Sequence, residues 1–553
     1  MKKRITIILV TMSVATLLVV PLASSATKKT LDAGSTWEVV ETTSLKSLTI
    51  KDGAVIKAPE GYSITMTVDG VETPIEAGTY KGNIVLTPTE EIVVSGAGGP
   101  NRDNPLKFRI GVDIEDGKYV QEKSVSAAVV GGEVTDSYVK DVRITSVGDH
   151  FNGIRVIGDS EYSINNAKIN FKGNGGNDFA GHGAGIMASG NANVTLDNSE
   201  IITDGVIRTT VYVGGHSTMH VNNSYMSSDS PPLPEVVSGM MEPPWELSLD
   251  GTCRATMVCE YGTAIYTNSH IKAQRWGALS TDGCRDVKLY AFNCIIETID
   301  SGYGTYSEGN CAVAFSGCTL NVADYAMIMQ GGDGVFTDGT VVNSKRNGVM
   351  VHSGRGRGTE ILTIDRGSVF NTEEAVMLIK TSGPDIIVDN AKLNSKNGII
   401  LQSMLSDDPH SGTVEADLHV TFSNMSMDGD IVNSNTTKGN LKATFKNVTI
   451  KGAITTAIAE GVGVIDKEHR ENIGRMINRY CDPSDKYGVI VLFDKDSQWI
   501  IDKTSYLTSL TIGDGAAITA PQGYSVTMTV DGIGKEIKAG TYKGKIVFTV
   551  TKS

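Results

Sequence analysis

The sequence lacks the motifs that bind the common cofactors. It has no phosphate-binding loop, no dinucleotide fingerprint and no histidines and cysteines at zinc-ligand spacing. Aromatic residues make up only 6% of the chain, and helical periodicity of apolar residues is scarce. We therefore expect a chain with little α-helix, and any chemistry it performs should need neither a cofactor nor a metal.

Positive charge is also in short supply. The 49 Lys and Arg residues face 63 Asp and Glu residues, which gives a formal net charge of −14 at pH 7. The field of such a protein repels nucleic acid and polyanionic glycans. We expect no nucleic acid partner, and we expect a small molecule or a glycan as the substrate.

Long apolar runs are confined to the N-terminus. Lys2, Lys3 and Arg4 precede the run ITIILVTMSVATLLVVPLA, and the small residues Ser24 to Ala26 follow it. This order is typical of a secretory signal, so we expect residues 1–26 to be cleaved. The mature protein would then be secreted, periplasmic or at the cell surface, without an integral membrane segment. An uncleaved anchor is the alternative.

A duplicated segment flanks the rest of the chain. GYSITMTVDG at 61–70 returns as GYSVTMTVDG at 523–532, and Trp37 matches Trp499. Alternating apolar residues and Gly-containing turns predict small β modules at 27–107 and 497–553, the latter a copy of 36–96. We expect the two copies to fold alike and to stand apart from the segment between them. Capping is the favoured role, with mutual pairing or binding as alternatives.

Glycine is abundant, with 61 residues, and a looser repeat of about 22 to 27 residues fills the middle of the chain. GALST, GTYSE, AMIMQ, GVMVH, AVMLIK and GIILQ align in one column, whereas VTLDNSEI, VFTDGTVV, LTIDRGSV and IIVDNAKL align in another. This pattern of three short strands per repeat, with Asn, Asp or Gly at the bends, resembles that of the right-handed parallel β-helix superfamily, the pectin-lyase-like fold. The resemblance covers roughly 108–460 and implies an all-β solenoid over 108–462.

Residues in one column of such a solenoid lie about one strand spacing, ~4.8 Å, apart. Cys284 and Cys311 share one column, and Cys294 and Cys318 share another. We expect both pairs to be neighbours, and disulfides between them are plausible in an exported protein. Buried reduced thiols are the alternative.

The same columns predict a groove on the outside of the solenoid. Ionisable and polar groups fall in one column, namely Thr281, Glu308, Gln330, His352, Lys380 and Gln402. Leu279, Tyr306, Ile328, Met350, Met377 and Ile400 would share their outward parity. An insertion at 230–251, rich in proline, could serve as a lid over this stripe. Simple structural packing over the stripe is the alternative.

We assign catalysis to Glu308 and His352, which would exchange protons, together with Tyr303 and Tyr306. The expected substrate-binding residues are Trp276, Arg275, Tyr325, Gln330, Lys380, Met240 and Trp245. The predicted function is an exported, cofactor-independent lyase, isomerase or hydrolase acting on a carbohydrate or an aromatic small molecule. The alternative is a cell-surface adhesin or a glycan-binding structural solenoid without catalysis.

A second candidate site consists of His150 and His182, which share a column. GHG at 181–183 resembles the polygalacturonase-type glycoside hydrolase motif. The paired aspartates that should precede such a motif instead follow it, in SDDP at 406–409. A structural role for the two stacked histidines is the alternative.

One helix is expected, in the connector 463–496. Ile473, Met476 and Ile477 have helical spacing, and Asp466 could cap the first turn. We expect this helix to pack on the end of the solenoid.

Overall fold

The computed structural model describes residues 28–94, 106–233, 245–352, 360–408, 414–482 and 486–553. Strands dominate these ranges, and the all-β prediction is confirmed. The helical elements described are four 3₁₀ turns, η1 (Gln121–Lys123), η2 (Ser126–Ala128), η3 (Trp245–Leu247) and η4 (Arg470–Asn472). Within the same ranges, no helix has the length and apolar character needed to cross a membrane.

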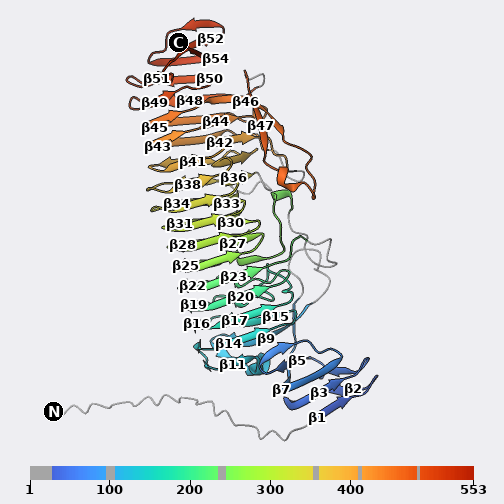
Figure 1. Ribbon diagram of the computed structural model, residues 1–553. Helices are drawn as coiled ribbons and strands as arrows, with labels where there is room; N and C mark the ends of the chain where they lie inside the picture. Colours follow the sequence, from blue (N-terminus) through green and yellow to red (C-terminus); the bar gives the residue numbers. More distant parts are fainter. Residues whose placement is uncertain (1–27, 95–105, 234–244, 353–359, 409–413, 483–485) are drawn as a thin grey trace, which may run out of the picture.

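Three long sheets of mostly parallel strands build the body of the protein (Figure 1). We call these sheets I, II and III. From β13 (Tyr138–Lys140) to β43 (Leu418–Asp428) the chain visits sheets II, III and I in a repeating order, so each strand up to β40 (Asp385–Asp389) pairs with the strand three positions later. We call three such successive strands a rung. This arrangement is consistent with a β-helix solenoid, and Figure 1 shows the rungs stacked along one axis.

The strands of the three sheets have the following bounds; β47 and β48 extend sheets II and III beyond the last rung. Sheet I contains β14 (Arg143–Ser146), β17 (Lys168–Lys172), β20 (Glu200–Asp204), β23 (Tyr225–Asp229), β26 (His270–Ala273), β29 (Ile295–Thr298), β32 (Thr319–Val322), β35 (Val341–Ser344), β38 (Val369–Thr372) and β41 (Lys392–Ser395). Sheet II contains β9 (Leu106–Glu115), β15 (Phe151–Ile157), β18 (Ile186–Ala188), β21 (Val211–Val213), β24 (Arg254–Glu260), β27 (Gly277–Cys284), β30 (Tyr303–Glu308), β33 (Tyr325–Gln330), β36 (Asn347–His352), β39 (Met377–Lys380), β42 (Ile399–Met404), β44 (Asp430–Asn433), β46 (Ile454–Gly461) and β47 (Met476–Tyr480). Sheet III contains β13 (Tyr138–Lys140), β16 (Glu161–Asn165), β19 (Asn193–Asp197), β22 (Thr218–Asn222), β25 (Thr263–Thr267), β28 (Val287–Phe292), β31 (Cys311–Ser316), β34 (Asp333–Thr337), β37 (Ile361–Ile364), β40 (Asp385–Asp389), β43 (Leu418–Asp428), β45 (Leu441–Lys451) and β48 (Val489–Phe493).

In most rungs the bend from sheet III to sheet I is made by one residue in the left-handed conformation; Asp338–Gly339 and Arg366–Gly367 are two-residue exceptions. Asn occupies the single position in most rungs, for example Asn198 and Asn223, both at φ 50°, and Asn268 at φ 49°. Asn tolerates this region because its short amide hydrogen-bonds locally, and Gly317 fills the same place without a side chain. The expected Asn, Asp or Gly at the bends is confirmed.

The residue after the bend is Ser in several rungs and Cys in two of them, at Cys294 and Cys318. Ser199 donates its backbone N–H to Ser224 Oγ at 3.0 Å, and Cys294 donates its own to Cys318 Sγ at 3.4 Å. The thiol thus stands in a ladder in which serine hydroxyls do the same work in other rungs. Cys284 and Cys311 are also hydrogen-bonded neighbours. Both predicted pairs are adjacent. All seven cysteines are free thiols, so the expected disulfides are absent.

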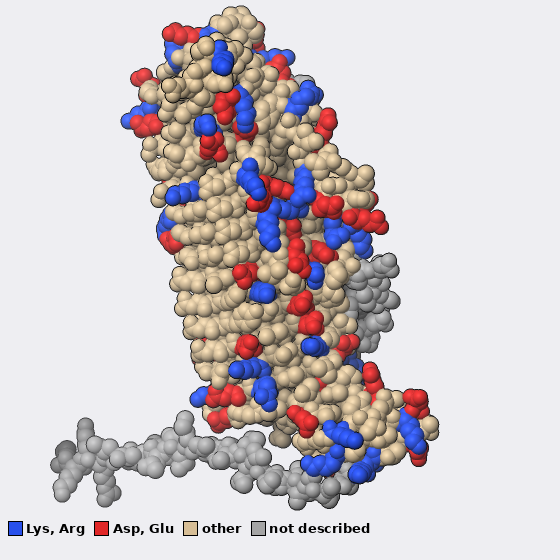
Figure 2. Space-filling model, viewed as in Figure 1, with Lys and Arg blue, Asp and Glu red and all other residues tan. Residues whose placement is uncertain are grey.

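The core inside the rungs is one apolar cluster that runs from the first rungs into the C-terminal module. Aromatic rings stack along it from rung to rung, with centroids 5.2 Å apart for Phe315 and Phe336 and 4.6 Å apart for Phe445 and Phe493. On the surface, acidic and basic side chains are interspersed over the visible face (Figure 2).

The two end modules have the same strands at the same offset. The matched pairs are β1 (Lys28–Leu31) with β48, β2 (Thr36–Glu38) with β49 (Gln498–Ile500), β3 (Thr43–Ile50) with β50 (Ser505–Ile512), β4 (Val55–Lys57) with β51 (Ala517–Thr519), β5 (Tyr62–Val68) with β52 (Tyr524–Val530), β6 (Val71–Thr73) with β53 (Ile533–Lys535), and β7 (Gly78–Glu90) with β54 (Gly540–Lys552). The register shift in the β3–β7 pair recurs in the β50–β54 pair.

The modules join the rungs through opposite edges. The N-terminal module pairs β6 with β14, whereas the C-terminal module pairs β48 and β49 with β45. The expectation that both stand apart from the rungs is therefore wrong. The N-terminal module keeps an apolar core of its own, but the C-terminal core is continuous with that of the rungs.

Residues that differ between the copies lie at these edges. Glu72 of the N-terminal module is fully buried against the first rung, where it pairs with Arg109 and accepts from Ser146 Oγ at 2.6 Å. Its counterpart is Gly534, on an exposed strand. Conversely, Lys29 covers Trp37 on the free edge, whereas the matching Trp499 is fully buried and donates to the Gly452 carbonyl oxygen at 2.9 Å.

The connector 463–496 contains no α-helix in its described part, so that prediction is wrong. Residues 476–480 instead form β47, antiparallel to β46, with alternating burial. Gly474 adopts φ +77°, which ends any right-handed helix before β47 begins. The carboxylate of Asp466 caps a short turn by accepting the N–H groups of Glu468 and His469.

The buried Glu72 gives a test of how the N-terminal module docks. We expect Glu72→Gly, which copies Gly534, to destabilise the protein by about 3 kcal/mol, because Arg109 loses its buried partner. Denaturant unfolding followed by circular dichroism measures this change. Glu76→Lys is the matched control, since it copies Lys538 at an exposed position and should change little. Equal stability of the two variants would contradict the docking role of Glu72.

Candidate functional site

The outer face of sheet II brings most of the predicted site residues together. Tyr303 pairs with Tyr325, and Glu308 pairs with Gln330 on the next strand. His352 pairs with Lys380 one strand further along. The predicted columns through these residues are confirmed.

Part of the predicted stripe is displaced by one residue. Tyr306, Ile328 and Met350 lie outward as expected, in a second apolar cluster outside the main core. Leu279, Met377 and Ile400 instead belong to the core between the sheets. The outward positions of those rungs are Ser280, Leu378 and Gln402.

The displacement in β27 has a local cause. Trp276 adopts φ +65°, so Gly277 and not Trp276 pairs with Tyr303. The register of β27 therefore begins one residue later than the alignment predicts. As a result Asp282, rather than Thr281, lies against Glu308.

The outer face of sheet II is filled by two segments of the same chain. Leu247 and Leu249 from residues 245–251 and Met476 from β47 pack on the outward stripe. Trp245 begins η3 and is partly buried, whereas Met240 lies outside the described residues. For the described part of the insertion, structural packing is what we observe.

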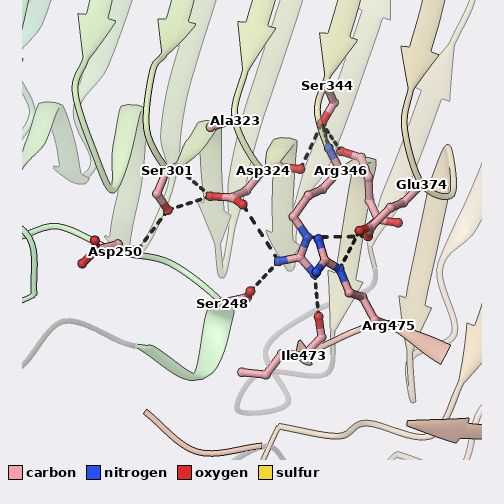
Figure 3. Close-up of polar contacts among 12 residues, drawn as sticks. Ser248, Asp250, Ser301, Ala323, Asp324, Ser344, Arg346, Glu374, Ile473 and Arg475 are labelled. Atoms are coloured by element: carbon pink, nitrogen blue, oxygen red, sulfur yellow. Dashed lines mark hydrogen bonds and ion pairs between the residues drawn. The ribbon is translucent and has the colours of Figure 1, made fainter. Parts of the chain in front are cut away.

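Arg346 holds both covering segments in place (Figure 3). Its side chain is 6% exposed. It donates to Ser248 Oγ of the first segment and, at 2.7 Å, to the carbonyl oxygen of Ile473, which lies just before β47. Its Nε lies 3.5 Å from Glu374, which also binds Arg475 Nε at 2.7 Å. One buried cation thus links sheet II to both covers.

Two predicted substrate-binding cations have partners within the protein. Arg275 donates to the Ser230 carbonyl oxygen at 2.8 Å and pairs with Asp300 at 2.7 Å, so it fixes the base of the insertion. Lys380 pairs with Asp407 at 2.6 Å. A pocket of about 230 Å³ remains beside the second cover, lined by residues that include Glu374, Leu378, Gln402 and Asn478.

A row of charged groups lies at the other end of the covered face. Arg254, with a side chain 4% exposed, binds Asp178 at 2.6 Å and Asp282 at 2.9 Å. Its guanidinium lies 4.5 Å from the ring centroid of Trp276. The Asp282 carboxyl is in turn hydrogen-bonded to Glu308, which lies 3.3 Å from the Gly283 backbone nitrogen.

Sequence reasoning missed Arg254 and Asp282. Asp282 stands in the aligned segment GALSTDGC, but the extra residue at Trp276 hid its column. Arg254 lies at the first position of β24, opposite Gly277, and only this cross-strand pairing relates it to the site.

The carboxyl pair and the tyrosines have shifted titrations. Burial and the hydrogen bond that the protonated Asp282 carboxyl donates to Glu308 raise the pKa of Asp282 well above its usual range, against the opposing effect of Arg254. Burial, with the charges of Asp282 and Glu308, also raises the pKa of Tyr306. Burial raises the pKa of Tyr303 to about 12, and its hydroxyl is 2.7 Å from Ser280 Oγ. Both tyrosines therefore stay protonated at neutral pH.

His352 is a neutral side chain in this environment. Burial and the nearby Lys380 charge lower its pKa to about 3. The Gln330 amide nitrogen is hydrogen-bonded to His352 Nε2. His352 is 2% exposed, and Gln330 lies on the strand between His352 and Glu308. A carboxamide does not carry protons at neutral pH, so the predicted proton exchange between Glu308 and His352 has no direct path.

The second candidate site is an aromatic stack. The ring of His182 stacks on Phe108 at 4.3 Å, and His150 meets the same ring edge-on at 5.7 Å. Burial lowers the pKa of His182 to about 4. Asp178, which precedes GHG, binds Arg254 and thereby belongs to the charged row of sheet II.

This arrangement supplies one carboxyl pair, one buried guanidinium and two tyrosine hydroxyls in a single region. In the described ranges, no group of three or more His, Cys, Asp or Glu side chains is placed to hold a metal ion. No protein-family model and no curated protein matches the chain.

The pKa of His352 leads to a prediction about pH. The unfolded histidine has a pKa of about 6.5, so the unfolded state binds a proton that the folded state excludes between about pH 6.5 and 3. Stability is therefore lost as the pH falls through this window, and His352→Gln should remove that part of the loss. NMR titration of the imidazole and denaturation midpoints measured from pH 7 to 4 check both points. An imidazole that titrates near pH 6.5 would contradict the prediction.

Proposed function

We propose that the protein is an exported acid–base enzyme built on a right-handed parallel β-helix, with its centre at Asp282 and Glu308. The three-sheet order of the strands supports this fold, and right-handedness is the rule for parallel crossovers. The signal-like N-terminus supports export to the periplasm, the cell surface or the medium.

The carboxyl pair carries the proposal. Two hydrogen-bonded carboxyl groups hold one proton between them, because two negative charges cannot share a buried site. A purely structural ion pair with Arg254 would need only one carboxylate, and Asp178 already supplies it at 2.6 Å. Perturbed carboxyls of this kind cluster at functional sites.

The pair offers both halves of acid–base catalysis. The protonated carboxyl gives its proton to a substrate oxygen, while the ionised carboxyl accepts one from the substrate or from water. The hydroxyl of Tyr306 and the guanidinium of Arg254 stabilise negative charge that develops between them. This set suits a lyase, an isomerase or a hydrolase that needs no cofactor.

Access is from the strand end rather than through the covers. The Asp282 side chain is 13% exposed, and the next residue, Gly283, is exposed. A substrate therefore reaches the pair where β27 turns away from the sheet. A carbohydrate or an aromatic small molecule fits the mixture of carboxyl, tyrosine and tryptophan side chains in this region.

A second candidate is a glycan-binding solenoid without catalysis. The observation that favours it is the filled face of sheet II, where Leu247, Leu249 and Met476 occupy the stripe expected to hold substrate. The two candidates differ in whether any substrate is chemically changed.

The catalytic proposal is tested with isosteric variants. Exported protein is screened against carbohydrate and phenolic libraries, with product mass as the readout. We expect Asp282→Asn and Glu308→Gln to lower turnover by roughly 10²- to 10⁴-fold without lowering the melting temperature much, because each removes a proton carrier and keeps the shape.

Asp286→Asn is the matched control, since Asp286 is an exposed carboxylate four residues from Asp282. It should keep full turnover. Full activity of both pair variants would exclude this centre. A wild-type protein that changes nothing in either library would favour the non-catalytic candidate.

A further inference from the structure

The outer face of sheet I, a different sheet from the one that carries the carboxyl pair, has an open groove. Its volume is about 660 Å³, and it crosses the five strands from β29 to β41. Its lining consists mainly of Asn, Ser and Thr side chains of these strands, together with Glu297, Lys345, Glu373 and Lys396. All of them lie in the described ranges, and unlike the stripe of sheet II the groove is open.

The floor of the groove is a ladder of asparagine side chains. Asn321, Asn343, Asn371 and Asn394 are consecutive cross-strand partners. Each amide nitrogen donates to the amide oxygen of the preceding asparagine at 2.9 Å. Glu297 ends the ladder by accepting from Asn321 at 3.3 Å.

The ladder leaves regular hydrogen-bonding capacity toward solvent. An asparagine amide has two N–H donors and two acceptor lone pairs, and the ladder uses one donor and one lone pair of each inner member. Asn343, Asn371 and Asn394 are exposed, so each presents at least one further donor and acceptor. The repeat equals the strand spacing of ~4.8 Å, which gives a row of roughly 19 Å from Glu297 to Asn394.

The charges around the ladder cancel. Two lysines and two glutamates line the groove, and Lys396 is paired with Glu373. Lys345 donates to the Ile299 carbonyl oxygen at 3.1 Å. A polyanion would find no net positive charge here and would be repelled by the protein's charge of −14.

A row that is aliphatic at three of its five positions lies beside the polar ladder; we call these three residues, Ile295, Val341 and Val369, the apolar row. Two residues before the ladder on their strands, and on the same face of sheet I, stand Ile295, Thr319, Val341, Val369 and Lys392. Ile295 is 45% exposed. The face therefore offers a row of amides beside aliphatic side chains, which match the hydroxyl edges and the C–H faces of sugar rings.

We propose that this groove binds an extended, uncharged polysaccharide along the axis of the rungs. The chain of sugars would lie over the asparagine ladder, with hydroxyls bound by the outward amide groups and ring faces against the apolar row. The site lies on a different sheet from Asp282 and Glu308, so this proposal does not depend on catalysis.

The test uses affinity gel electrophoresis of the full chain in gels that contain one polysaccharide each. The neutral probes are soluble β-glucan, xylan, mannan and starch, and the charged probe is polygalacturonate. We expect retardation by at least one neutral probe and none by polygalacturonate. Asn343→Ala/Asn371→Ala should raise the dissociation constant at least tenfold, because two inner members of the ladder are lost.

Two further variants separate the explanations. Asn394→Ala removes only the exposed end of the ladder, so it tests binding without disturbing the inner members, and it should weaken binding severalfold. Asn165→Ala/Asn222→Ala, in strands of sheet III, is the matched control and should bind as wild type.

Three results would overturn the proposal that the groove binds a neutral polysaccharide. They are no retardation by any neutral probe, unchanged binding in both folded ladder variants, or retardation by polygalacturonate alone. None of these bears on turnover by the carboxyl pair, so failure of one proposal is distinguishable from failure of the other.

Discussion

The backbone hydrogen bonds between successive rungs are the constraint on which the rest of the structure depends. They fix each side chain directly against its counterpart one strand away, so every column of the sequence becomes a physical stack. Phe315 and Phe336 stack in the core, serines and cysteines form a ladder after the bends, and asparagines form another on sheet I. At each position of a rung, the side chains in the rungs before and after therefore restrict which residue can pack or form hydrogen bonds there.

The same constraint decides which outer faces are covered. Sheet II repeats apolar residues outward, as at Ile328 and Met350, and such a stripe must be removed from water. The chain covers it with residues 245–251 and β47, and Arg346 joins both covers to the rungs. Sheet I instead repeats asparagine outward, and amides that bond one another need no cover. The face that stays open is therefore polar by composition.

The repeat grammar was enough to predict an all-β chain, the bends and the columns through Glu308, Gln330 and His352, because strand alternation and turn chemistry are local. The site was predicted less well. One left-handed residue, Trp276, shifted the register of β27 and concealed Asp282, and no sequence signal marks that conformation. The prediction of a helix in the connector was wrong for another reason. The free edge of β46 offers backbone hydrogen-bond partners to residues 476–480, and this pairing overrides the helical spacing of residues 473–477.

The end modules follow from the polarity of the stack. A stack of parallel strands has two different ends, here β14 of sheet I at one end and β45 of sheet III at the other. A duplicated module can close both ends only if it docks through two different edges, and this is how the copies are used. Each copy then carries docking residues at one edge and solvent-facing residues at the other. Glu72 is buried at the docking edge of the N-terminal copy, whereas its counterpart Gly534 is exposed. Lys29 lies on the free edge, whereas its counterpart Val491 is buried. A lysine on the free edge also discourages pairing with further strands, so the divergence between the copies is what converts a repeated module into two caps.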